Sequence, residues 1–145
     1  MDTLLTIHQG PRRTDVVQLL EAAALPTSDL TDDHMSDFFY VGPAAAPVGI
    51  VGVQFYDADA LLRSLVVLTE RRTQGLGRRL VEHAEQHARK HGAATVYLLT
   101  TTAGSFFQSR GYTVTSRDSA PPAIRSTPEF AGLCPASSAF LSKRL

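Results

Sequence analysis

The chain has little of three things that many function classes need: cysteine, lysine and net charge. Its 145 residues include one cysteine, Cys134, which excludes an intramolecular disulfide and a cysteine-rich metal site. Fourteen Lys and Arg balance fourteen Asp and Glu, so the formal net charge is zero. A generic nucleic-acid binder carries a strongly basic face, and the charge balance argues against that class.

Long apolar runs are also missing. None approaches the roughly eighteen residues of a membrane span, and the opening MDTLLTIHQGPRR lacks the pattern of a signal peptide. Hydrophobic residues make up 43%, which is enough to form a core. We therefore expect one cytoplasmic domain over residues 1–145, with no membrane or nucleic-acid partner.

Hydrophobic periodicity predicts a mixed α/β fold. Strands are expected in TLLTIHQ, FFYVG, VGIVGVQFY, ALLRSLVVL, TVYLLTT, YTVTS and SAFLSKRL, the last of which closes the sheet. Helices are expected from the caps Thr14 and Asp15 to Pro26, over 31–37 with Thr31 as N-cap, over 75–92 and over 103–109. The order predicts a mostly antiparallel sheet of six to seven strands, flanked by helices, with one βαβ unit.

Several local features carry more detailed expectations. Gly49 and Gly52 suggest a bend or bulge in their strand. The near-continuous apolar run TVYLLTT suggests a strand buried on both faces. On the helix over 75–92, Glu85 and Arg89 are spaced to form an ion pair. Its apolar stripe consists of Leu76, Leu80, Val81, Ala84 and Ala88.

The most informative segment joins a strong strand to this helix through a glycine-bearing loop. Unpaired backbone N–H groups at a helix start, at the positive end of the helix dipole, form an anion site. Gly75 and Gly77 let the backbone approach a diphosphate, and Arg72 and Arg78 add charge-assisted hydrogen bonds. The alternative is an ordinary turn with solvated arginines. The arginine cluster favours a phosphate cradle; it comprises Arg71, Arg72, Arg78 and Arg79.

Two other phosphate cradles are excluded. The G-x-x-x-x-G-K-[ST] loop is absent, since the lysines are Lys90 and Lys143. The dinucleotide-binding G-x-G-x-x-G also fails, because Leu80 stands at its third glycine.

The remaining pattern resembles that of the GNAT N-acetyltransferases. Arg72-Thr73-Gln74-Gly75-Leu76-Gly77 is similar to their coenzyme A pyrophosphate loop, Arg/Gln-x-x-Gly-x-Gly/Ala, and likewise follows the fourth strand. Ala103-x-x-Phe106-Phe107-x-x-x-Gly111-Tyr112 resembles their Ala-x-x-Phe-Tyr-x-x-x-Gly-Phe motif. The resemblance covers nearly the whole chain. It implies an acetyltransferase that uses acetyl-CoA and no metal.

The resemblance also implies roles for particular residues. The amine attacks the thioester directly, and the backbone N–H of Val67 polarises the acetyl carbonyl. Thr101 stands where many relatives carry an asparagine that contacts the pantetheine arm. The residues implied to bind the cofactor are Leu65, Val66, Val67, Arg72, Thr73, Gln74, Gly75, Leu76, Gly77, Arg78, Thr101 and Phe106.

The proton donor and the base stay open. The family's usual acid is a tyrosine, and this chain has Phe107 at that position, which carries no exchangeable proton. The alternative donors are Ser105, Ser109, Tyr112 or a bound water. The alternative bases are Glu70, His34 or a chain of waters.

A narrower resemblance concerns the acceptor. LLRSLVV, YLLTTTAGSFFQSRGY and APPAIRSTPEFAGLCPASSAF together resemble a subgroup of N-acetyltransferases associated with arsenic resistance. A related branch acetylates the amine of arsinothricin and phosphinothricin. The resemblance therefore implies a small amino acid with an arsinate or phosphinate group. Arginine suits such an anion, so Arg63 and Arg125 are the candidate substrate residues, with solvated charge as the alternative for each.

Other functions stay open as alternatives. The phenylalanine at the acid position allows a non-catalytic acyl-CoA-binding module, and a protein or peptide N-acetyltransferase is a third hypothesis. His83, His87 and His91 follow helical spacing, but the edge they share has no carboxylate, so we expect no metal. Cys134, before a proline, is expected to be a small packed residue. The resemblance also implies that two copies pair through their C-terminal strands.

Overall fold

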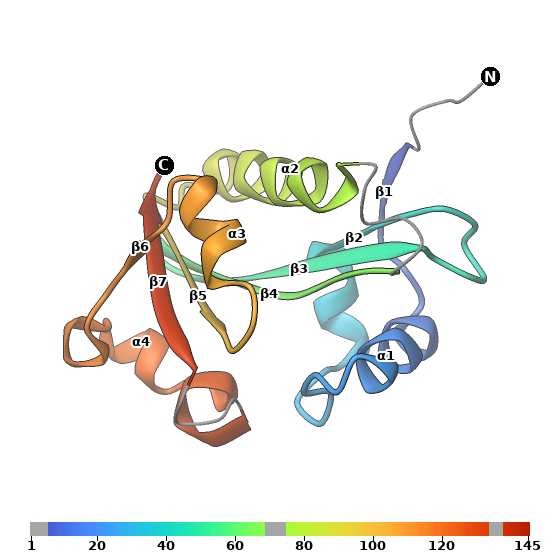
Figure 1. The fold of residues 1–145 in the computed structure, drawn as a ribbon. Coiled ribbons are helices and arrows are strands. Elements are labelled where there is room, and N and C mark those ends of the chain that lie inside the picture. Colours follow the sequence, from blue (N-terminus) through green and yellow to red (C-terminus); the bar gives the residue numbers. More distant parts are fainter. Residues whose placement is uncertain (1–5, 69–74, 134–137) are drawn as a thin grey trace. The chain divides into compact units, whose positions relative to one another are not determined.

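The computed structural model describes residues 6–68, 75–133 and 138–145. In these ranges the strands form one mixed sheet in the order β1-β2-β3-β4-β5-β7-β6 (Figure 1). β4 and β5 pair in parallel, whereas β1–β2, β2–β3, β5–β7 and β6–β7 are antiparallel. The strands are β1 (Ile7–Gln9), β2 (Phe38–Val41), β3 (Gly49–Tyr56), β4 (Asp59–Val67), β5 (Thr95–Thr100), β6 (Thr113–Val114) and β7 (Ala139–Arg144).

The helical segments agree with the predicted order and differ at some ends. They are α1 (Arg13–Ala22), η1 (Asp32–Asp37), α2 (Leu76–Lys90), α3 (Gly104–Ser109), η3 (Arg117–Ser119), α4 (Pro122–Arg125) and the π-helical η4 (Glu129–Leu133). Thr31 caps η1 as predicted. Thr14 and Asp15 are not caps, because α1 begins one residue earlier and Asp15 instead pairs with Arg12 at 2.7 Å. Among the described residues, no helix combines the length and apolar character needed to cross a membrane.

These elements gather into two compact units. The first comprises Met1–Val53 and Ser64–Ala84, and the second comprises Gln54–Arg63 and Glu85–Leu145. The division runs through β3, β4 and α2, so each of these elements contributes one part to each unit.

The core of the first unit lies between its strands and α1. In Figure 1, α1 and the first half of α2 lie on opposite sides of these strands. Because alternate residues of a strand point to opposite faces, β3 packs against α1 on one face and against α2 on the other. Ile50 points into the cluster with α1, whereas Gly49 lies against Leu80 of α2. The buried residues of this cluster are Val16, Leu20, Leu30, Met35, Phe38, Ile50 and Val66.

The glycines of β3 do not form the expected bulge. Gly49 and Gly52 pair in register with Val41 and Phe38 of β2. The ring of Phe38 lies directly over Gly52, so a Cβ at that position would overlap the ring. Gly52 is therefore required by close cross-strand contact, since only a residue without a side chain leaves room for a fully buried phenylalanine.

The core of the second unit lies between its strands and the proline-bearing C-terminal segment. The buried residues Leu61, Ala120, Ile124 and Phe140 form it, and Tyr56, Tyr97, Leu99 and Phe130 pack against it while partly exposed. The prediction that β5 is buried on both faces is therefore wrong: Val96 and Leu98 are buried, but the alternate residues of β5 are not. The short helical segments leave part of this face uncovered.

Replacing Gly52 by alanine is expected to lower the free energy of unfolding by about 1–3 kcal/mol, because the added methyl group overlaps the Phe38 ring. Urea unfolding measures this change. Gly104→Ala is the matched control: a Cβ there meets no heavy atom within 4 Å, so its stability should be unchanged or slightly raised. Equal losses in the two variants would contradict the account.

Candidate functional site

The site begins where β4 changes its conformation. The pairs between β4 and β5 run from Asp59–Thr95 to Leu61–Tyr97, although β4 continues to Val67. Ser64 has a φ of 64°, which is uncommon for a residue with a side chain and interrupts the regular strand. Ser64 thus marks a local bend of the backbone directly before residues 65–67.

The residues predicted to contact the pantetheine arm follow this bend. Leu65 and Val67 are half-buried, and the side chain of Val66 enters the core of the first unit. Val66 thus anchors the segment, while the side chains of Leu65 and Val67 point to the opposite face of the strand.

Only the last part of the predicted phosphate loop lies among the described residues. Arg72, Thr73 and Gln74 lie outside them, as does the candidate base Glu70. Gly75 has a φ of 71°, a conformation that favours glycine, and a Cβ there would meet nothing within 4 Å. Leu76 then begins α2 and is buried.

The first turn of α2 combines backbone donors with positive charge. The N–H of Arg79 donates to the carbonyl of Gly75 at 3.2 Å, so the N–H groups of Leu76, Gly77 and Arg78 have no acceptor within the helix. No acidic residue lies in this turn, and Arg78 is exposed. The helix dipole stabilises an anion at this end by about 0.3–1 kcal/mol and disfavours a cation, so the turn fits an anionic group such as a pyrophosphate.

The apolar stripe of α2 is buried as predicted, but Glu85 is not on the exposed face. Its carboxylate is buried and accepts a hydrogen bond of 2.9 Å from the phenol of Tyr112. It also accepts bonds of 3.0 and 3.2 Å from Nζ of Lys143, which donates in addition to the carbonyl of Arg110 at 2.8 Å. The expected pair of Glu85 with Arg89 is therefore wrong, because Glu85 faces the interior and meets Lys143 of β7.

This buried network removes Tyr112 from the candidate proton donors. Burial, and secondarily the charge and hydrogen bond of Glu85, raise the pKa of Tyr112 far above its ordinary value. A phenol with a strongly raised pKa that already donates to a carboxylate does not release its proton to a thiolate. Tyr112 instead joins α2 to the segment that follows α3.

The short helix α3 presents the remaining hydroxyl candidates. Phe107 is buried, with its ring edge-on to that of Tyr112 at 5.5 Å and to that of Phe106 at 5.1 Å. The hydroxyl of Ser109 donates to the carbonyl of Phe106 at 2.6 Å, whereas Ser105 is exposed. Ser109 is exposed as well, but its hydroxyl proton is already donated to this carbonyl, whereas no such bond is described for Ser105. Thr101, just before the helix, is also exposed.

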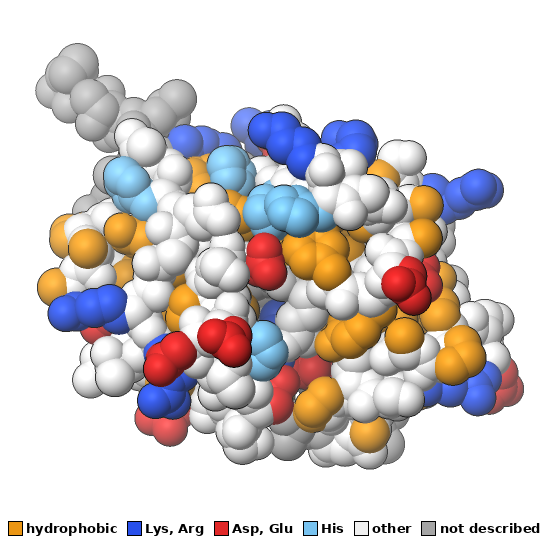
Figure 2. Space-filling model, turned by 180° about the vertical axis from the view of Figure 1, so that it is seen from behind, with side chains coloured by type: hydrophobic (Ala, Val, Ile, Leu, Met, Phe, Trp, Pro, Cys, Tyr) orange, Lys and Arg blue, Asp and Glu red, His pale blue; other side chains and the backbone are white. Residues whose placement is uncertain are grey.

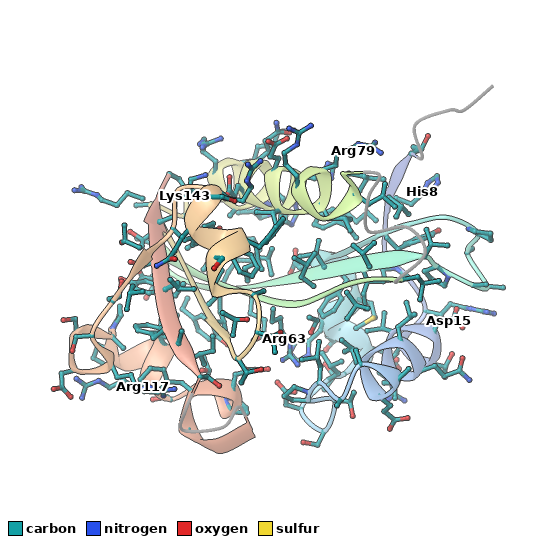
Figure 3. The ribbon with its side chains drawn as sticks, in the orientation of Figure 1. His8, Asp15, Arg63, Arg79, Arg117 and Lys143 are labelled. Carbon is teal, nitrogen blue, oxygen red and sulfur yellow. The ribbon has the colours of Figure 1, made fainter. Side chains whose placement is uncertain are left out.

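The two arginines expected to bind substrate are placed differently. Arg125 is exposed, and its Nη2 donates to the carbonyl of Asp118 at 2.5 Å. Arg63 is buried and forms an ion pair with Glu129 of η4. It lies on the side of the sheet that α4 covers (Figure 3). Sequence reasoning missed Glu129, because no periodicity or motif in the proline-bearing segment distinguishes it from a solvated glutamate.

The histidines contact aromatic rings. On the second half of α2 the rings of His87 and His91 lie 4.2 Å apart, and His91 stacks on Phe55 at 5.0 Å. His83, in the first unit, lies edge-on to Phe39 at 4.6 Å. Figure 2 shows histidine side chains beside apolar ones on one face. The candidate base His34 uses Nδ1 to accept the N–H of Thr31 at 3.1 Å, as part of the cap of η1; Cys134 lies outside the described residues.

Comparison with known proteins identifies this arrangement. Residues 36–114 match the acetyltransferase (GNAT) domain family. An uncharacterised N-acetyltransferase of Chlorobaculum tepidum is 37% identical over 93 residues, which are 63% of this chain and 59% of the relative. The chain thus spans about three fifths of the length of the curated relative that it matches.

Solved structures share the fold. The N-acetylglutamate synthase of Neisseria gonorrhoeae, solved with coenzyme A and N-acetyl-glutamate, has a TM-score of 0.81 at 21% identity, over 100% of this chain and 36% of that protein. A Mycobacterium tuberculosis protein in complex with CoA has a TM-score of 0.79 at 19% identity, over 97% of this chain and 99% of that protein. The predicted α/β fold is therefore confirmed.

Tyr112→Phe is expected to flatten the alkaline part of the stability profile. Because the folded pKa of Tyr112 is raised, the native chain keeps the phenolic proton, whereas the unfolded chain releases it above about pH 10. Its contribution to stability is thus complete below that pH and is lost above it, by up to about 1.4 kcal/mol per pH unit.

Urea unfolding between pH 8 and 11.5 tests this expectation. Tyr40→Phe, which changes a partly exposed tyrosine of β2, should keep the wild-type slope. If the free energy of unfolding falls equally steeply with pH in the wild type and in Tyr112→Phe, the phenol of Tyr112 is not buried and bonded to Glu85 as described.

Proposed function

Because the chain belongs to the GNAT acetyltransferase family, we propose that it transfers an acetyl group from acetyl-CoA to the amine of a small molecule. The observation that carries this proposal is the start of α2. There, Gly75, the N–H groups of the first helical turn and the exposed Arg78 follow one another in the chain, and the turn has no acidic residue. Relatives of the same fold solved with coenzyme A support the choice of anion.

The residues present fit coenzyme A. The N–H groups of Leu76, Gly77 and Arg78, with the guanidinium of Arg78, would hold its pyrophosphate, together with Arg72, Thr73 and Gln74 outside the described residues. The backbone of 65–67 would pair with the pantetheine arm, and Thr101 and Phe106 would be further contacts of the cofactor. When bound, acetyl-CoA supplies an acetyl group activated as a thioester.

The chain's own contribution is mainly to position the reacting groups, which is worth about 7–11 kcal/mol in favourable cases. The bond from the amine nitrogen to the acetyl carbon forms as the carbon–sulfur bond breaks. One proton leaves the nitrogen and one reaches the sulfur, so atoms and charge balance. We place the N–H of Val67 on the acetyl oxygen, where negative charge develops.

The proton transfers are assigned by elimination. Phe107 has no exchangeable proton, the phenol of Tyr112 donates to Glu85, and the hydroxyl of Ser109 donates to the carbonyl of Phe106. Ser105, exposed on α3, is therefore the proposed route by which a proton reaches the sulfur, directly or through water. Glu70, directly after the segment that follows β4, is the proposed base.

The proposed acceptor is an amino acid that carries an arsinate or phosphinate group. The support is the likeness of the C-terminal segment to the arsenic-resistance subgroup, together with a buried guanidinium, Arg63, beneath that segment. The alternatives are a non-catalytic acyl-CoA-binding module, which Phe107 favours, and a peptide acetyltransferase.

Release of the CoA thiol with a panel of amines tests the reaction. Phosphinothricin is expected to be acetylated faster than lysine-containing or N-terminal peptides, with mass spectrometry confirming one acetyl group on its nitrogen. Tight acetyl-CoA binding without turnover of any amine would instead identify a non-catalytic module. Turnover of peptides alone would identify a peptide acetyltransferase.

Arg78→Ala is expected to raise the Kd for CoA about tenfold, a loss of about 1.4 kcal/mol, because it removes one charge-assisted contact to phosphate. Isothermal titration calorimetry measures the Kd. Arg89→Ala is the matched control, since it removes an exposed arginine from the last turn of the same helix and should leave the Kd unchanged. An equal rise of the Kd in both variants would show that these arginines act through the overall charge of the protein and not through a contact between Arg78 and the phosphate.

A further inference from the structure

The second half of α2 ends with two histidines that stand one helical turn apart. His87 lies in the last turn of the helix, and His91 follows its final residue, Lys90. We propose that His87 and His91 bind one divalent transition-metal ion, with water in its remaining coordination positions. The proposal goes beyond the acetyl transfer proposed above, which uses no metal, and does not depend on it.

Helical spacing brings the two imidazole rings together. Residues four apart are neighbours on the surface of a helix, and the ring centroids of His87 and His91 lie 4.2 Å apart. A ring nitrogen of one lies within 4.8 Å of a ring nitrogen of the other. Two nitrogens on one ion are about 3.3 Å apart, because each metal–nitrogen distance is about 2.0–2.1 Å. Rotation of a ring about its soft χ2 torsion is enough to reach this separation.

One hydrogen bond decides which nitrogen of His91 can bind a metal. Nδ1 of His91 lies 2.9 Å from the carbonyl oxygen of His87. A carbonyl oxygen can only accept, so Nδ1 carries the proton and the lone pair of the neutral ring is on Nε2. Metal-binding histidines usually donate their second N–H to a carbonyl or carboxylate in this way, which orients the ring. His91 thus has the protonation pattern of a metal ligand before an ion binds.

Phe55 of β3 restricts the orientation of both rings. Its ring is stacked on that of His91 at 5.0 Å with an interplanar angle of 23°, and it lies 5.6 Å from the ring of His87. His91 is nevertheless exposed, and His87 is partly exposed, so an ion can reach the pair from water. Ligands that are already oriented lose less rotamer freedom on binding, which lowers the entropic cost.

The electrostatics of the helix end are compatible with a cation. The carbonyl end of a helix carries partial negative charge, so the helix dipole stabilises a positive ion bound there. Arg89 and Lys90 lie in the same turn and oppose an added positive charge. Both are exposed, and water and dissolved salt therefore weaken their repulsion of the ion.

The donor atoms determine the class of ion. Neutral imidazole suits Zn²⁺, Ni²⁺ and Cu²⁺, whereas Mg²⁺ and Ca²⁺ are bound through oxygen ligands. Affinity at a nitrogen site rises from Co²⁺ through Ni²⁺ to Cu²⁺. The sequence-based expectation of no metal relied on the missing carboxylate along the helix edge that the histidines share. An ion held by two imidazoles and water does not need that carboxylate.

Calorimetric titration of the full chain with Ni²⁺ tests the proposal, using protein without a histidine tag and without CoA. Ni²⁺ is the probe because, unlike Cu²⁺, it does not oxidise a cysteine thiol. One ion per chain is expected, and Mg²⁺ at the same concentrations should not bind. His91→Gln is expected to raise the Kd for Ni²⁺ at least tenfold, because glutamine is polar but has no imidazole nitrogen. His87→Gln should have the same effect, since either change leaves a single imidazole.

Two other histidines provide matched controls. His83→Gln removes the histidine one turn earlier on α2, and His8→Gln removes an exposed histidine of β1. Both variants should keep the wild-type Kd. Ni²⁺ should also raise the urea midpoint of the wild type more than that of His91→Gln, because the ion binds the folded pair. An unchanged Kd in His91→Gln, or an equal rise in His83→Gln, would overturn the proposal.

Discussion

The first turn of α2 sets the constraint on which the candidate site depends. Its backbone N–H groups have no acceptor within the helix, and Arg78 adds positive charge where the dipole is already positive. The rest of the first unit keeps this turn in place: Leu76 and Leu80 are buried, and Val66 anchors the end of β4 in the core. A helix start built in this way is most stable with an anion bound to it, which is why we propose it as the binding site of the coenzyme A pyrophosphate.

The second unit buries charge at two places that join distant segments of the chain. Glu85 accepts hydrogen bonds from Tyr112 and Lys143 and thereby joins α2 to β7 and to the segment that follows α3. Arg63 forms an ion pair with Glu129 at the edge of an apolar cluster, which joins β4 to the proline-bearing C-terminal segment.

Local sequence patterns predicted the helices and strands, whereas the side-chain contacts depend on residues far apart in the sequence. Alternating and helical periodicity located the strands and the buried stripe of α2, because both depend on neighbouring residues. The partner of Glu85 lies 58 residues away on β7, and no local spacing signals it. The same holds for Gly52, whose role is set by Phe38 on the neighbouring strand, and for Glu129, whose partner Arg63 belongs to β4. The motif around Gly75 can be recognised in the sequence because the residues that define it are consecutive.

Hydrogen exchange at the first turn of α2 tests the central claim most directly. The amide protons of Leu76, Gly77 and Arg78 should exchange at least tenfold more slowly when CoA is added, because the pyrophosphate becomes their acceptor. The amides of Ala44 and Ala45, in an exposed loop, provide the internal reference and should not change. Binding of CoA with unchanged exchange at Leu76–Arg78 would contradict the account, since the coenzyme would then be held elsewhere.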